Sequence, residues 1–323
     1  MFHAELYKKV LINPISSGSN KLYIVSGYAT AAMAFRHLSE LRDITSDISI
    51  DLIVGMAPTD GVSYSNHEAF KKLVNEDFNG ILNCSYVCRK PPVHSKLYIW
   101  EQDGDLTHAF IGSANYTQNA FIANKNREIC AECDPFKAFD YFKSLIDDTF
   151  YCNHNDIENE VLIYKDRNRP YRREPITPSD IIDNDFEIDE SNTEHVCISL
   201  LDPEGNLPTR SGLNWGQREG REPNQAYIRV PAKIAKTDFF PPRTVHFTLH
   251  TDDGKILICS RAQDGDKAIH TPHNNSLIGE YFRNRLGVAN GQMVRLEDLI
   301  EYGRTDVNFY KLDDETYYMD FSV

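Results

Sequence analysis

The sequence predicts a layered α/β domain followed by a mainly-β domain whose strands form a barrel-like sheet. Three observations predict this fold class. Apolar runs typical of strands alternate with helical patterns in the first half of the chain, whereas strand patterns dominate the second half. A polar, acidic segment that contains prolines separates the two halves. With 323 residues the chain is long enough for two cores. We therefore expect domains at 1–155 and 196–323, joined by an acidic interdomain linker at 156–195.

The first domain alternates strands and helices along the chain. Asp134 is placed to cap the last helix of the domain, and Pro135 suits its first turn. Strand-like runs occupy 22–30, 48–56, 81–88, 94–101, 107–113 and 127–133, and helical patterns occupy 31–41, 66–79 and 135–150. This alternation indicates a sheet flanked by helices.

The second domain consists mainly of short strand patterns. One helix is expected at 276–287, with Ser276 able to cap it and Gly287 placed to end it. The strand-like runs occupy 196–201, 226–231, 244–250, 255–263, 293–299, 309–314 and 316–323. Many short strands with a single helix favour a barrel-like sheet.

The distribution of charge points to a basic surface within an acidic protein. The net charge of −14 is unfavourable for binding nucleic acid, because such proteins usually carry a basic face. However, residues 180–194 alone hold seven acidic side chains and no basic one. The segments 207–233 and 255–295 each have a net charge of +3. A positive surface is therefore available in the second domain.

Composition also limits the location and the chemistry of the protein. No apolar run approaches the ~20 residues that a membrane helix needs, and no apolar leader opens the chain, so we expect a cytoplasmic protein. The seven cysteines are odd in number and scattered. The pairs Cys84/Cys88 and Cys130/Cys133 alternate with apolar residues, which favours buried, reduced thiols over zinc ligands. We expect no metal site and no cofactor.

Four side chains of the first domain form a pattern suited to phosphodiester cleavage. His94 and Lys96 are two apart in a strand-like run, which would direct both to one face. Asn115 follows a turn at Gly112 and Ser113, and Glu128 opens the next strand. Lys96 and Asn115 would neutralise the phosphate, with Ser113 as a secondary candidate. The His94 imidazole would attack, and Glu128 would orient it.

Cleavage also requires an acid that protonates the leaving oxygen. The chain has one His-x-Lys pattern and no second one to supply that acid. A two-fold homodimer would supply it by placing His94 of both chains in one site.

This pattern resembles the phospholipase D superfamily, whose motif is His-x-Lys, four residues, Asp, and then a Gly-Ser turn with Asn. This chain has Glu101 where the family has Asp, and the gap to Gly112-Ser113-x-Asn115 is longer. The pattern is therefore closer to the nuclease branch of the superfamily, in which Asn and a later Glu complete the site. The resemblance implies metal-independent chemistry through a phosphohistidine and assembly of one site by two subunits. It spans about 20–150.

Two polar segments of the second domain are rich in side chains that read DNA bases or bind phosphates. They lie at 209–231 and 260–275, where two arms extending from a small barrel could grip a major groove. The alternative is that both are ordinary exposed loops. The candidate DNA-binding residues are Arg210, Asn214, Trp215, Gln217, Arg218, Arg221, Asn224, Arg261, Gln263, Asp264, Lys267, His273 and Asn274.

The second half resembles the B3-like DNA-recognition domain of certain restriction endonucleases, through SGLNWGQ and the NxAYIxxP strand after it. A phospholipase-D-like nuclease followed by a B3-like pseudobarrel is the layout of the BfiI/NgoFVII-like enzymes. The resemblance implies a type II-like endonuclease that recognises a short site in double-stranded DNA. Some members depend on a partner ATPase, so an accessory ATPase or helicase-like protein stays open as a partner.

Two other functions fit the residues alone. One is a phospholipase-D-type phosphodiesterase that acts on RNA or lipid, and the other is a DNA-binding regulator that does not cleave. The acidic run 180–194 also has two interpretations. It is either a solvated linker or a phosphate mimic that blocks the DNA-binding site.

Overall fold

The computed structural model of the chain describes residues 1–123, 125–164 and 193–323. These residues fall into two compact units. The first unit extends beyond residue 155, because helix α7 (Ile157–Glu160) and strand β9 (Ile163–Tyr164) belong to it and bury Ile157 and Ile163. The acidic run 180–194 lies almost entirely outside the described residues.

A mixed seven-stranded sheet forms the middle layer of the first unit, in the order β7-β6-β5-β1-β2-β4-β8. Its centre is parallel, since β1 pairs with β2 and β2 with β4 in the same direction, whereas the flanking pairs are antiparallel. The strands are β1 (Lys21–Ser26), β2 (Ser49–Val54), β4 (Leu82–Val87), β5 (Leu97–Gln102), β6 (Asp105–Gly112), β7 (Cys130–Glu132) and β8 (Thr149–Tyr151). A short strand β3 (Val62–Ser63) pairs with β9 outside this sheet.

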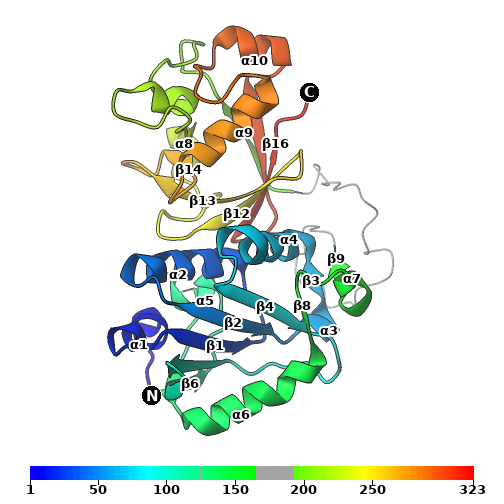
Figure 1. Cartoon of the computed structure of the whole chain (residues 1–323). Coiled ribbons are helices and arrows are strands. Elements are labelled where there is room, and N and C mark those ends of the chain that lie inside the picture. Colours follow the sequence, from blue (N-terminus) through cyan, green and yellow to red (C-terminus); the bar gives the residue numbers. More distant parts are fainter. Residues whose placement is uncertain (124, 165–192) are drawn as a thin grey trace. The chain divides into compact units, whose positions relative to one another are not determined.

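Helices cover both faces of this sheet (Figure 1). Helices α2 (Ala31–Ile44) and α4 (Tyr64–Lys72) lie on one face, and α6 (Pro135–Leu145) lies on the other. The predicted cap of α6 is confirmed, because the Asp134 carboxylate accepts hydrogen bonds from two backbone N–H groups of the first turn. Shorter helical turns are η1 (Tyr7–Ile12), α1 (Asn13–Ser16), α3 (Ala57–Asp60), η2 (Leu73–Asp77), α5 (Gln118–Phe121) and η3 (Ile146–Asp148).

One difference from the sequence prediction bears on the site. The strand expected at 94–101 begins only at Leu97, so His94 and Lys96 lie in the segment that leads into β5. The alternation of side chains along a strand therefore does not position these two residues. Close contacts with neighbouring segments position them instead.

The second unit is built on another seven-stranded sheet, in the order β10-β15-β16-β12-β13-β14-β11, which curls into a nearly closed barrel. Its core is rich in aromatic rings, among them Phe240, Phe247, Phe309 and Tyr317. The strands are β10 (His195–Ser199), β11 (Ile228–Arg229), β12 (Phe247–Thr251), β13 (Ile256–Ala262), β14 (Ala268–His270), β15 (Asp306–Lys311) and β16 (Thr316–Asp320). The helical elements are η5 (Gly212–Gln217), α8 (Ala232–Ala235), α9 (Ser276–Leu286) and α10 (Leu296–Tyr302). The predicted fold class is confirmed in both halves.

Two predictions for the second unit were wrong. The run 293–299, expected as a strand, contains the start of α10, because Asp298 caps the Arg295 N–H and Gly303 ends the helix with a left-handed φ of 100°. Ser276 does not cap α9; it lies inside the helix, and its hydroxyl donates to Glu222. Gly287 does end α9, with a φ of 68°.

All seven cysteines are free thiols. Cys84 and Cys130 are buried in the sheet of the first unit, as predicted, whereas Cys88 and Cys133 are only partly buried. Within the described ranges, no helix combines the length and apolarity needed to cross a bilayer.

Candidate active site

The candidate residues of the first unit gather at one edge of its sheet. Val25 near the end of β1 pairs with Leu97 at the start of β5, and Leu97 pairs with Ile111 near the end of β6. Gly112 then pairs with Cys130 at the start of β7. Because neighbouring strands alternate in direction here, the ends that carry the candidates lie together.

Gly27, directly after β1, is the point on which His94 and Asn115 converge. A Cβ atom added to Gly27 would lie 2.9 Å from Cδ2 of His94 and 3.3 Å from Oδ1 of Asn115. Both side chains therefore lie against the same backbone atom. The imidazole and the amide, 21 residues apart in sequence, can both approach the chain here because this position has no side chain.

The side chain of Asn115 has a fixed orientation. Its Oδ1 accepts hydrogen bonds from the Tyr28 N–H (3.2 Å) and from the Ser26 hydroxyl (3.4 Å). The backbone on both sides is also held, since the Tyr98 hydroxyl donates to the Ala114 carbonyl (2.7 Å) and the Tyr116 N–H donates to Ser26 Oγ (2.9 Å). The N–H groups of the Asn115 amide are thereby left to donate to a ligand.

Lys96 is the candidate cation of the site and is only 6% exposed. Its Nζ donates to the carbonyl of His94 at 2.6 Å, which holds the ammonium against the backbone of the residue that carries the imidazole. Burial lowers the pKa of Lys96, while the charge of Glu128 opposes that shift. A poorly solvated cation interacts more strongly with an incoming anion than an exposed one does.

Glu128 is held by the Gly-Ser turn. The Ser113 hydroxyl donates to Glu128 Oε2, and the Ile129 N–H donates to Ser113 Oγ (3.1 Å). Gly112 allows this approach, because a Cβ there would lie 2.1 Å from the Ile129 carbonyl oxygen. Glu128 thus contacts Ser113, and its charge favours the protonated form of Lys96. Within the described part of the chain it makes no hydrogen bond to His94. The sequence predicted that Glu128 orients the His94 imidazole, and the described residues contain no such contact.

Tyr28 is a further candidate site residue, which the motif pattern missed. Its ring packs edge-to-face against the imidazole of His94, with centroids 6.1 Å apart and planes at 81°. Its hydroxyl donates to Asp60, and burial together with that carboxylate raises the pKa of Tyr28 to about 12. The place of Tyr28, one residue after the glycine that ends a buried strand, was the signal available in the sequence. Glu101, by contrast, accepts from the Tyr23 hydroxyl (2.8 Å) in the far half of β5.

In the second unit, several expected DNA-binding residues are committed to the fold. Asn214 is 1% exposed, and its amide bonds the Pro208 carbonyl and the backbone of Val294. The Asn224 side chain accepts from the Gly291 N–H, and the Gln217 amide donates to the carbonyl of that same glycine. Both ends of the Asn214 amide and one end of each of the other two amides are paired with the backbone, so all three help to hold loops of the domain together.

Arg261 is also internal. It is 5% exposed and donates to the carbonyls of Ala235, Phe240 and Asp266. Its role is to hold the loop that follows β13, and a second arginine outside the predicted set, Arg243, donates to Asp266 and to the Gln263 carbonyl in the same loop.

The other candidates remain at the surface. Arg221 lies over the Trp215 ring, with its guanidinium carbon 3.8 Å from the centroid, and donates to Gln225. Arg218 donates to the carbonyl of Arg210. The remaining exposed candidates are Arg210, Gln263, Asp264, Lys267, His273 and Asn274. The segment 209–231 thus presents guanidinium groups that other side chains or the backbone hold in place, and the segment 260–275 presents an exposed turn.

Comparisons with known proteins agree with this division. Residues 4–159 match the family model of the NgoFVII restriction endonuclease N-terminal PLD domain, and residues 188–313 match that of the NgoFVII C-terminal B3-like DNA-binding domain. No curated protein matches the chain.

Two solved structures show some likeness to the chain. NucT from Helicobacter pylori is 18% identical over 46% of this chain and 96% of its own, with a TM-score of 0.32. Polyphosphate kinase from Porphyromonas gingivalis is 14% identical, with a TM-score of 0.29, over 47% of this chain and 23% of its own length.

Proposed function

Since the chain belongs to the NgoFVII restriction endonuclease family, we propose that it cleaves double-stranded DNA at a specific site through a phosphohistidine, without a metal ion. The observation that carries this proposal is the convergence of His94 and Asn115 on Gly27, with the buried ammonium of Lys96 bonded to the His94 carbonyl. The arrangement offers a nucleophile, a cation and an oriented amide donor, which are the groups that phosphoryl transfer requires.

In the first step, a ring nitrogen of His94 attacks the phosphorus, and the bond from phosphorus to the leaving oxygen breaks. Lys96 and Asn115 donate to the non-bridging oxygens and stabilise the charge that they carry in the transition state. A second imidazole, protonated beforehand, gives its proton to the leaving oxygen. In the second step, that imidazole removes a proton from water, the water attacks phosphorus, and the P–N bond breaks. Both imidazoles then return to their starting states.

We assign the second imidazole to His94 of the partner subunit in a two-fold dimer. Two features of one chain support this assignment. The His94 ring has no hydrogen-bond partner within the described residues, so both nitrogens are available for the reaction and for an orienting group. Beside the site, Ile111 and Ile129 are each 48% exposed, which suits contact with a second copy.

The proposal predicts DNA cleavage by the purified full-length protein in excess EDTA. His94→Ala is expected to abolish cleavage while leaving DNA binding intact, and quenching with a denaturant at alkaline pH, where a P–N bond survives, should trap 32P-labelled DNA on the wild-type protein. Strict dependence on Mg²⁺ would contradict the metal-independent step. Turnover of RNA or phospholipid in preference to DNA would favour the phosphodiesterase alternative, and binding without any nicking would favour the regulator.

The shared site has a separate test. Mixing wild-type protein with an excess of His94→Ala protein under subunit exchange should lower cleavage below simple dilution, because mixed dimers lack one imidazole. Activity proportional to the wild-type concentration would contradict a shared site. Cleavage by the purified chain without ATP would show that an accessory ATPase is not required.

A further inference from the structure

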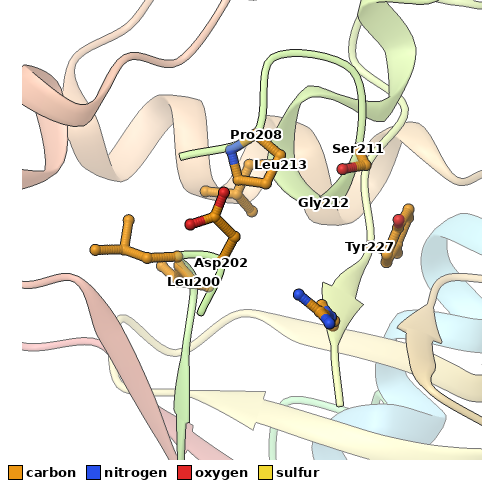
Figure 2. A pocket seen from close by; sticks show the side chains of 9 residues that line it. Leu200, Asp202, Pro208, Ser211, Gly212, Leu213 and Tyr227 are labelled. Carbon is orange, nitrogen blue, oxygen red and sulfur yellow. The ribbon is translucent and has the colours of Figure 1, made fainter. Parts of the chain in front are cut away.

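A pocket of about 130 Å³ lies in the second unit, where the segment 209–231 joins the sheet (Figure 2). It is enclosed by the turn that follows β10, by the start of η5 and by β11. Its walls are of mixed polarity, and their apolar part includes Leu200 and Leu213. Two side chains of opposite charge, Asp202 and Arg229, also line it. Neither was among the DNA-binding residues expected from the sequence.

The carboxylate of Asp202 is fixed in place. Its Oδ1 accepts hydrogen bonds from the backbone N–H groups of Glu204 (3.1 Å) and Asn206 (2.8 Å), within a turn that the Asp202 backbone also closes. In Figure 2 the carboxyl group points toward Pro208 and Leu213, into the space that the lining residues enclose. Because the turn holds the group, it cannot rotate away from a negatively charged ligand. Its second oxygen is left to accept from a donor.

Arg229 supplies the complementary group. It lies in β11 opposite Ala268 of β14, and its side chain is exposed. Its guanidinium has no hydrogen-bond or ion-pair partner among the residues that the structure describes, and Asp202 is beyond ion-pair distance from it. The pocket therefore presents a free planar donor and a fixed acceptor that do not neutralise each other.

This combination distinguishes between the possible ligands on DNA. A phosphate would suit Arg229 alone, but the fixed carboxylate of Asp202 would repel it. The edge of a G·C pair in the major groove suits both groups. Guanine offers O6 and N7 as neighbouring acceptors for an arginine fork, and cytosine offers its N4 amine to a carboxylate. An A·T pair also has an amine, but it lacks two adjacent acceptors on one base.

We propose that Asp202 and Arg229 read one G·C base pair of the recognition site, with Arg229 on guanine and Asp202 on cytosine. This assignment rests on the proposed function, because it requires sequence-specific binding of double-stranded DNA. It adds the identity of one base pair and the two side chains that select it. Arg210, one residue before Ser211 at the border of the pocket, is then placed to contact the flanking backbone.

The test is selection of bound sites from a randomised duplex library by the full-length chain. All proteins carry His94→Ala, which prevents cleavage during selection. Asp202→Asn and Arg229→Ala are compared with this parent. Asp202→Asn keeps an oxygen for the two N–H groups of the turn and replaces the free acceptor with a donor. Lys233→Ala, which removes an exposed cation on α8 outside the pocket, is the matched control.

We expect the parent to require G·C at one position, and both variants to lose discrimination at that same position by about 10-fold or more, with the other positions unchanged. Lys233→Ala should relax no position. Uniform weakening of all sequences by Arg229→Ala, with a lower salt dependence, would indicate a phosphate contact and overturn the proposal. Relaxation at two different positions, or at none, would also overturn it. A parent that selects no sequence would instead contradict the proposed function.

Discussion

Replacing Gly27 by alanine tests the geometry on which the candidate active site depends. The added methyl carbon would lie 2.9 Å from Cδ2 of His94, a distance that Cβ atoms in proteins essentially never show, and 3.3 Å from Oδ1 of Asn115. Gly27 does not have a left-handed φ, so alanine itself introduces no backbone strain there. The imidazole is the group that can move, because the amide is held by Tyr28 and Ser26.

The size of the displacement follows from the contact distance. Ordinary van der Waals contact begins near 3.4 Å, so the imidazole must retreat by roughly 0.5–1 Å. A misplacement of this size costs on the order of 100-fold in rate when the reacting atoms must be aligned. We therefore expect the kcat for DNA cleavage in EDTA to fall about 100-fold. The free energy of unfolding should change little, because the ring can shift.

The control is Gly104→Ala, in the turn between β5 and β6 at the opposite end of the hairpin. Gly104 has a φ of 99° and nothing within 4 Å of an added Cβ. Alanine there should cost about 1 kcal/mol of stability through backbone strain and leave kcat unchanged. A Gly27→Ala protein that melts normally and cleaves at the wild-type rate would refute the idea that His94 acts from the position described.

Three further predictions test other parts of the molecule. Tyr28→Leu should lower kcat about 10-fold with little change in KM, because the imidazole loses its packing surface. Tyr28→Phe keeps the ring and should keep most of the activity. Equal losses for the two variants in steady-state cleavage assays would exclude this positioning role. Arg283 is fully buried and donates to five backbone carbonyls. Arg283→Met should therefore lower the free energy of unfolding by about 3 kcal/mol in urea titrations. A wild-type midpoint of unfolding would contradict the structural role of Arg283. Burial lowers the pKa of both His37 and His67 to about 4. Because the unfolded chain takes up these protons near pH 6.5, the free energy of unfolding should fall between pH 6.5 and 4, by about 3 kcal/mol for each histidine. A flat profile of the free energy of unfolding over this range would rule out that both histidines are buried in the neutral form.

The first domain was largely predictable because its signals are local. Apolar runs of strand length and amphipathic helical patterns each depend on a few neighbouring residues, and Asp134 caps α6 as its sequence position indicated. The candidate residues could be chosen from the sequence because they lie next to strand-like runs, and antiparallel pairing in the structure brings the ends of β1, β5, β6 and β7 to one edge. The contact that unites the site could not be predicted. Gly27 contains no functional group, and its role depends on how closely two distant segments approach it.

The second domain shows why residue type alone does not identify a binding surface. Asn214 and Arg261 have the chemistry of base readers, yet both are buried and bonded to backbone carbonyls. A long loop that crosses the surface of a small barrel must have its own peptide groups satisfied, and amide and guanidinium side chains do this well. The same residue types are therefore expected in the supports of a recognition arm and on its binding face.

The distinction between support and binding face lies in whether the polar groups are already paired. Arg261 and Arg229 are both arginines of the same domain, but one donates to three carbonyls and the other to none within the described residues. A group that is paired in the free protein gains little by exchanging one partner for another on DNA, whereas an unpaired and exposed donor gains the full interaction with a base edge. Sequence specificity should therefore depend on Arg229 and Asp202 more than on the more arginine-rich and amide-rich stretch between them.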